Sequence, residues 1–407
     1  MAAMRKIRRS QVRGGWSAVL ALTLCVSTLI ASEFMPVSLL TPIATGLHLS
    51  EGQAGQAIAV SGVFAVLTSL FISTATRRVD RRTLLLALTG VMIASGLMVA
   101  FAPSYAVFMA GRALIGVVIG GFWSMSTATV MRLVPEKDVP RALALLNGGN
   151  ALAATVAAPL GSFLGQYIGW RGAFFCVVPL AAVTLAWQLL ALPKMPSRER
   201  STTAAAFKVL RKPRVPLGIL AVALFFMGQF ALFTYLRPFL ETVTAVSVST
   251  LSLILLVVGL GGIAGTYLIG SLLKRSLYGL LVGMPLAMAA VAVGLVALGS
   301  SAVVVTALLA LWGLIGTAAP VAWWTWMSKV LPDDAEAGGG LMVAVIQLAI
   351  TVGASVGGLL FDGSGYRATF GASALILGSS AIVALIAARK AAVPDAADWS
   401  EAAVQAA

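Results

Sequence analysis

Long apolar runs, spread along the whole chain, constrain the fold more than any other feature. A helix needs about 20 mostly apolar residues to cross a hydrocarbon core of about 30 Å. Only 10% of the residues are charged, where a soluble domain carries roughly 25%, so the chain predicts an all-α membrane protein with twelve transmembrane helices. The predicted spans are 17–44, 53–75, 84–102, 107–131, 142–165, 172–192, 215–239, 250–272, 277–298, 303–328, 338–360 and 369–388.

One polar stretch, rich in Lys and Arg, divides these spans into six plus six. We therefore expect an N-terminal six-helix half at 1–192 and a cytoplasmic linker at 193–214. A C-terminal six-helix half should follow at 215–390, with a cytoplasmic tail at 391–407.

The basic residues are placed unevenly. If the N-terminus is cytoplasmic, all but four of the 28 Lys and Arg residues fall in cytoplasmic segments. The four exceptions are Arg112, Arg171, Arg237 and Arg367. Cytoplasmic loops of membrane proteins carry such an excess of Lys and Arg, so we expect both termini inside. The net charge of +14 is thus assigned to cytoplasmic loops and not to a surface that binds nucleic acid.

The two halves share a repeated segment. Residues 161–174 align with residues 357–370 without a gap, at an offset of 196 residues. Both contain Gly-aromatic-Arg, as Gly169-Trp170-Arg171 and Gly365-Tyr366-Arg367. Parallel repeats of this kind occur in secondary transporters, so the repeat favours a transporter over an enzyme.

The connector between the second and third spans contains an acid among arginines. It reads Arg77-Arg78-Val79-Asp80-Arg81-Arg82. Arginines alone would indicate only a cytoplasmic anchor, but an Asp at a helix end can hold an Arg and a facing helix terminus in one conformation and release them in another. We expect Asp80 and Arg81 to act as a gate.

Two ionisable residues fall inside predicted spans, Glu33 in the first and Arg112 in the fourth. An intramembrane Arg costs at least about 2.5 kcal/mol, so it normally has a partner or lines a polar path. Burial disfavours a carboxylate and a nearby Arg favours it, so two access states that differ in these terms can take up and release a proton. We expect Glu33 and Arg112 to couple transport to protons. Two alternatives stay open: Arg112 reaches the membrane surface by itself, or the two form a permanent ion pair.

These features resemble the major facilitator superfamily. The Asp80-Arg81 pair is similar to its cytoplasmic gate motif, and Arg112 with Gly116 and Gly120 to its helix-four arginine motif. Ala158-Pro159-Leu160-Gly161 resembles the Gly-Pro motif of its antiporters in helix five. The resemblance implies two six-helix halves and efflux rather than uptake.

A closer resemblance is to the bacterial purine ribonucleoside efflux pumps of the drug:proton antiporter-1 branch. The segments that carry it are 16–19, 33–42, 121–126, 131–135, 229–238, 323–326 and 344–348. The resemblance implies export of inosine, guanosine and purine analogues across the cell inner membrane in exchange for protons.

A nucleoside is flat, uncharged and rich in hydrogen-bonding groups. We expect its site to offer aromatic faces, each contributing about 1–3 kcal/mol by analogy with base stacking, together with amides for its polar edges. The candidates are Trp123, Asn147, Asn150, Gln229, Phe233, Tyr235, Trp323, Trp324 and Gln347. For any single Trp, a membrane-interface or packing role is the alternative.

Other functions predict different partners. A multidrug or sugar exporter of the same fold is the first alternative, and a non-transporting membrane receptor or scaffold is the second. The sequence has no nucleotide-binding loop and no metal-ligand spacing, so we expect no cofactor, no metal and no catalytic residues. The expected partners are a small-molecule substrate, protons and the lipid bilayer, and the expected state is a monomer.

Overall fold

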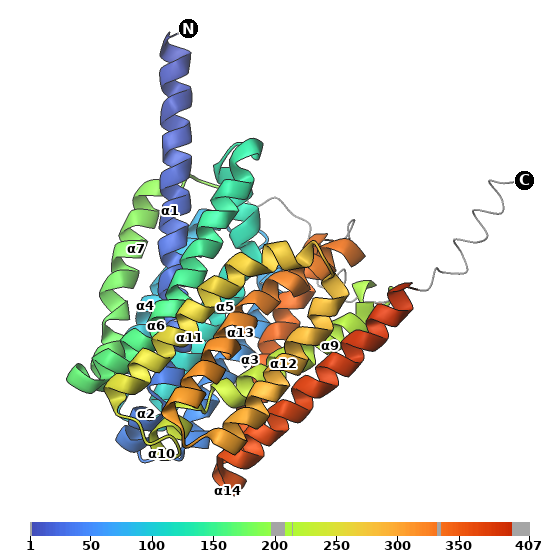
Figure 1. Ribbon diagram of the computed structural model, residues 1–407. Helices are drawn as coiled ribbons and strands as arrows, with labels where there is room; N and C mark the ends of the chain where they lie inside the picture. The colour runs from blue at the N-terminus through green and yellow to red at the C-terminus, as the bar shows by residue number, and fades with distance from the viewer. Residues whose placement is uncertain (1, 197–207, 214, 332–334, 393–407) are drawn as a thin grey trace, which may run out of the picture.

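The computed structural model describes residues 2–196, 208–213, 215–331 and 335–392, and these residues form a bundle of helices without a strand (Figure 1). The predicted all-α fold is confirmed. The helices are α1 (Ala2–Ser38), α2 (Leu40–Leu47), α3 (Glu51–Ala75), α4 (Arg81–Ala100), α5 (Tyr105–Leu133), α6 (Val139–Phe175), α7 (Val177–Ala191), α9 (Val215–Phe233), α10 (Leu236–Thr242), α11 (Val248–Leu273), α12 (Leu277–Leu298), α13 (Ala302–Val330) and α14 (Ala335–Ala392), with a short 3-10 turn at Glu136–Asp138.

Ten segments of the described residues are long and apolar enough to cross a membrane. Two of them, Glu136–Ala191 and Gly338–Lys390, have 56 and 53 residues. A single crossing needs only about 20, and each of these segments contains two of the predicted spans. Inside α6 and α14 the backbone leaves the helical conformation at Gly169 and Gly365, where two helices meet at a kink.

The backbone breaks repeat at the spacing found in the sequence. Gly169 has φ 70° and Gly365 has φ 74°, and these two glycines are 196 residues apart. Leu39 separates α1 from α2 and Tyr235 precedes α10, again 196 residues apart, with similar backbone angles (φ −117° and ψ 14°; φ −103° and ψ 17°). The repeat thus extends to the first helix of each set.

Polar residues begin several helices by binding free backbone N–H groups. At the start of α3, the Ser50 hydroxyl accepts from the N–H of Gln53, and the Gln53 side chain accepts from the N–H of Ser50. Asp80 caps α4, and Ser247 caps α11. These caps explain why the helices begin where the short polar connectors end.

Buried apolar residues form one large cluster drawn mainly from residues 209–384 and two clusters drawn mainly from residues 18–195. We call α1 to α7 the first part of the chain and α9 to α14 the second part. The two parts are joined where α3 packs on α14 and where α6 packs on α11. Side chains cross between the clusters: Val37, Ile58 and Ala158 belong to the large one. Tyr235 belongs to a cluster of the first part.

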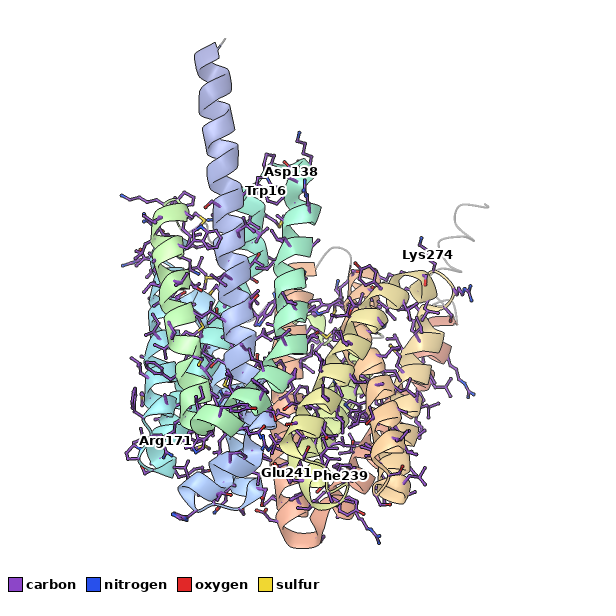
Figure 2. All side chains as sticks on the ribbon, turned by 60° about the vertical axis from the view of Figure 1, so that its left-hand side comes forward. Trp16, Asp138, Arg171, Phe239, Glu241 and Lys274 are labelled. Atoms are coloured by element: carbon purple, nitrogen blue, oxygen red, sulfur yellow. The ribbon has the colours of Figure 1, made fainter. Side chains whose placement is uncertain are left out.

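The bundle has two distinct ends. We call the end where α1 begins and α14 finishes the terminal end, and the opposite one, where α2 and α10 lie together, the far end (Figure 1). Figure 2 shows Trp16, Asp138 and Lys274 at the terminal end and Arg171 and Glu241 at the far end. The start of α1 and the end of α14 thus lie on one side of the molecule (Figure 1).

The kink at Gly365 gives a test of the fold. A side chain there meets no neighbour, but the residue keeps a positive φ, and its φ/ψ region is occupied essentially by Gly alone at a cost of about 1–3 kcal/mol for other residues. We expect Gly365→Ala to lower the free energy of unfolding by that amount and to lower the thermal midpoint in detergent. Gly363→Ala is the matched control, because its Cβ also meets nothing and its φ is not positive. Equal midpoints for the two variants would contradict this account.

Candidate functional site

Arg112 lies on α5 with a side chain only 1% exposed. Its guanidinium donates to the backbone oxygens of Ala57 (3.2 Å), Ser32 (2.9 Å) and Glu33 (3.2 Å), and to the Ser61 hydroxyl (3.3 Å). These acceptors belong to α1 and α3, so one side chain joins three helices. In the structure Arg112 is a buried cation, and each of its three guanidinium nitrogens donates to an oxygen of α1 or α3.

Glu33 lies on α1 and is 8% exposed. Its backbone oxygen, and not its carboxylate, accepts from Arg112. The carboxylate oxygen Oε1 instead accepts from the side-chain amide of Gln347 on α14, at 3.4 Å. The acid therefore faces the second part of the chain while the cation holds the backbone behind it, which differs from the closed ion pair that was one alternative.

Further contacts join the two parts around Gln347. Thr351, one turn later on α14, donates its hydroxyl to the backbone oxygen of Gln347 at 2.8 Å, and the same hydroxyl lies 3.3 Å from the backbone oxygen of Ala59 on α3. Phe34, next to Glu33, stacks on Phe230 of α9 with ring centroids 6.0 Å apart. Glu33 thus lies beside a contact between α1, α9 and α14.

Three of the predicted substrate residues lie close to this contact in sequence or space. Gln347 touches Glu33 directly. Phe233 is half-buried and packs edge-on against Phe230, with centroids 6.1 Å apart. Gln229 precedes Phe230, and its buried Oε1 has no hydrogen-bond partner, which leaves an acceptor for a polar ligand or for water.

The tryptophans occupy three different environments. Trp123 is half-buried on α5 and packs edge-on against Phe122, with centroids 6.0 Å apart. Trp323 is buried on α13, next to Trp326, and its indole N–H has no partner. Trp324 is 41% exposed. The structure does not bring these three rings together into one stack.

The remaining candidates also lie apart. Asn147 is exposed and donates to the backbone oxygen of Leu143 within its own helix, at 3.0 Å, and Asn150 is half-buried one turn later. Tyr235 is fully buried between the two parts at the far end, and its hydroxyl donates to the backbone oxygen of Ala354 at 2.8 Å.

Asp80 caps α4 at the terminal end. Its Oδ1 accepts from the N–H of Arg82 and its Oδ2 from the N–H of Met195, both at 2.8 Å. The N–H of Arg81 donates to the backbone oxygen of Met195 at 3.0 Å. In this conformation Asp80 therefore joins the start of α4 to the non-helical segment that follows α7.

Sequence reasoning missed part of this arrangement. It named Glu33 and Gln347 but did not pair them, and it gave Phe34 and Asp362 no role. The signal for Asp362 was present, because this acid stands in the repeated segment where the first copy has Gln166.

The sequence model of the Major Facilitator Superfamily matches residues 20–342. The chain belongs to this superfamily. The match covers most of the chain and agrees with the long apolar helices described above. Members of the superfamily are membrane transporters, so this chain is a multi-pass membrane protein with a transporter fold.

Several curated proteins resemble the chain along nearly its whole length. The purine ribonucleoside efflux pump NepI of Shigella sonnei is 42% identical over 353 residues, which cover 87% of this chain and 89% of that protein. NepI of Salmonella paratyphi C is 42% identical over 378 residues, covering 93% and 94%. The transcription regulatory protein OpdE of Pseudomonas aeruginosa is 59% identical over 380 residues, covering 92% and 94%. The resemblance to purine ribonucleoside efflux pumps is confirmed.

Solved structures share the fold. A bacterial homologue of the human lysosomal transporter Spinster, in an inward-facing and unoccupied conformation, superimposes with a TM-score of 0.71 at 16% identity. The alignment covers 92% of this chain and 96% of that chain. The occupied form gives a TM-score of 0.72.

The Arg112 contacts generate a stability prediction. In Arg112→Met, buried carbonyls of α1 and α3 lose charge-assisted bonds that contribute about 1.5–3 kcal/mol each. Because three such bonds are lost, we expect the free energy of unfolding to fall by at least about 3 kcal/mol, seen as a lower thermal midpoint in detergent. Arg77→Met is the control, because Arg77 is exposed in the connector before α4. A midpoint lowered equally in both variants would show that the carbonyl contacts are not what stabilises the bundle.

Proposed function

We propose that this protein is a proton-coupled antiporter that exports purine ribonucleosides and their analogues from the cytoplasm. The observation that carries the proton coupling is the buried Glu33 carboxylate, which bonds across to Gln347 on the other part of the chain. Protonation removes the charge of this acceptor and so changes the contact between α1 and α14. The substrate class rests on the NepI relatives.

The energetics permit uphill export of a neutral solute. One proton that enters carries one charge, which yields about 2.3 kcal/mol per 100 mV of membrane potential. That energy equals a concentration ratio of roughly fiftyfold. A nucleoside without net charge needs no counter-charge in its site.

We propose that the substrate binds beside Glu33, between α1, α9 and α14. Phe233 would present an aromatic face, and Gln229 has an unpaired acceptor to offer. Gln347 would share its amide between Glu33 and the substrate. Trp123 and Asn150 are half-buried and complete the proposed set, whereas the buried hydroxyl of Tyr235 already has a backbone partner.

We propose that the N-terminal half (1–192) and the C-terminal half (215–390) move against each other. We also propose that the terminal end lies on the cytoplasmic side of the inner membrane. The excess of Lys and Arg in the connectors of that end supports this orientation. Asp80 and Arg81 then lie on the cytoplasmic side, where their contact with Met195 can act as a gate. Part of the linker (193–214) and of the tail (391–407) lies outside the described residues.

Glu33→Gln tests the mechanism. The variant keeps the size and hydrogen-bonding ability of the side chain but cannot release a proton, so we expect proton-driven export of inosine to be lost while the protein stays in the membrane. Glu136→Gln is the control, because Glu136 is exposed in the turn before α6. The measurement is uptake of radiolabelled inosine into inverted vesicles with an imposed pH gradient. Unchanged uptake by Glu33→Gln would refute the coupling role.

The substrate is tested separately by counterflow in proteoliposomes. Vesicles preloaded with unlabelled inosine should accumulate labelled inosine without any pH gradient, and guanosine should compete. Competition by lipophilic cations or sugars, with no response to nucleosides, would favour the multidrug or sugar exporter. Counterflow also separates substrate exchange from proton coupling, because the gradient of unlabelled inosine drives it and no proton gradient is needed.

A regulatory role is the second candidate, because a relative 59% identical is named a transcription regulatory protein. A chain buried in lipid can act on transcription by changing the cytoplasmic concentration of a small molecule, or as a sensor that transports nothing. Glu33→Gln distinguishes these cases: loss of both export and regulation indicates the former, and regulation that persists without export indicates the sensor.

A further inference from the structure

A carboxylate from the second part of the chain binds the start of a helix in the first part. Asp362, on the kinked segment of α14, accepts from the Ser50 hydroxyl at 2.5 Å and from the N–H of Gly52 at 2.9 Å. Ser50 is also the N-cap of α3, where its hydroxyl oxygen accepts from the N–H of Gln53. The acid therefore adds a second cap to α3, supplied from 310 residues away.

A cation from the second part binds the end of a helix in the first part. Arg237, on α10, is 4% exposed, and its guanidinium donates to the backbone oxygen of Ser38, the last residue of α1. A second guanidinium N–H donates to Glu241 one turn later, at 2.8 Å. The pairing with Glu241 compensates the buried cation and aims the remaining donors at α1.

The two contacts use side chains of opposite charge, and each charge is opposite in sign to the partial charge of the helix end that it meets. Free N–H groups give a helix start a partial positive charge, and free carbonyls give a helix end a partial negative charge. Asp362 meets the start of α3, and Arg237 meets the end of α1. Both contacts cross between the two parts of the chain at the far end, so separation at that end must break both.

The backbones approach closely between the two contacts. The Tyr235 ring stacks on Phe361, with centroids 5.3 Å apart, and its hydroxyl donates to Ala354, so α14 holds this ring in place. The ring lies against α3, where a Cβ at Gly55 would collide with the Tyr235 hydroxyl oxygen. A Cβ at Gly52 would lie 2.6 Å from the carboxyl carbon of Asp362 and 2.7 Å from the backbone oxygen of Gly358. Only a residue without a side chain lets α3 dock on α14 in this way.

We propose that Asp362 and Arg237 form a latch that holds the far end closed through two helix ends of opposite polarity, and that outward opening of the transporter requires its release. We define this latch as Asp362 with Ser50 and Gly52, and Arg237 with Ser38. It is separate from the Glu33 site and does not depend on the identity of the substrate.

Hydrogen–deuterium exchange of the full-length protein in lipid nanodiscs tests the latch, because exchange reports local opening. In Asp362→Asn the charge that binds α3 is lost, and the bonds of a charged acceptor are the stronger ones. We expect amides in residues 51–57 and 357–366 to exchange about tenfold faster. Glu51→Gln is the matched control, since it removes the same charge from the first turn of α3.

Gly52→Ala provides an independent variant, because it keeps every charge and blocks the close approach. We expect the same two segments to exchange faster, by a similar factor. The latch is refuted if Asp362→Asn exchanges like the unmodified protein, or if Glu51→Gln accelerates exchange as much. Faster exchange spread over α4 and α12 would refute it too, because that pattern is a general loss of stability. The assay uses no substrate and no proton gradient, so its outcome is independent of nucleoside export.

Discussion

Arg112 joins three helices at a depth where water is scarce. In that setting an unpaired guanidinium and unpaired carbonyls are both costly, and the structure removes both costs with one set of bonds to α1 and α3. The position of α1, and with it the position of Glu33, depends on this side chain. Because Arg112 is occupied by backbone oxygens, the Glu33 carboxylate is left to bind Gln347.

The internal repeat sets the backbone geometry of the helices that surround Arg112 and Glu33. The same backbone breaks occur at Leu39 and Tyr235, and again at Gly169 and Gly365. The equivalent residues have nevertheless taken different roles. Leu39 is a buried apolar residue. Tyr235 instead packs into a core cluster of the first part, while its hydroxyl bonds to Ala354 of its own, second part. The asymmetry falls at the far end, where the proposed latch lies.

The central contact and the latch would act on the same motion. Glu33 and Gln347 join the two parts beside α9, and Asp362 and Arg237 join them at the far end. A change in the charge of Glu33 alters the first contact directly. If the two parts rock about the middle of the bundle, the proposed proton site and the proposed latch would be linked through α14, which carries both Gln347 and Asp362.

The sequence by itself determined the helices, their repeat and the buried ionisable pair of residues, because apolar length and intramembrane charge are local properties of the chain. Only the tertiary structure decided which atoms meet. Arg112 binds the Glu33 backbone and not its carboxylate, Gln347 reaches Glu33 over 314 residues of sequence, and Asp362 caps a helix to which no motif connects it. Contacts of this kind depend on how two sets of helices pack against each other, and helical periodicity along one chain carries no record of that packing.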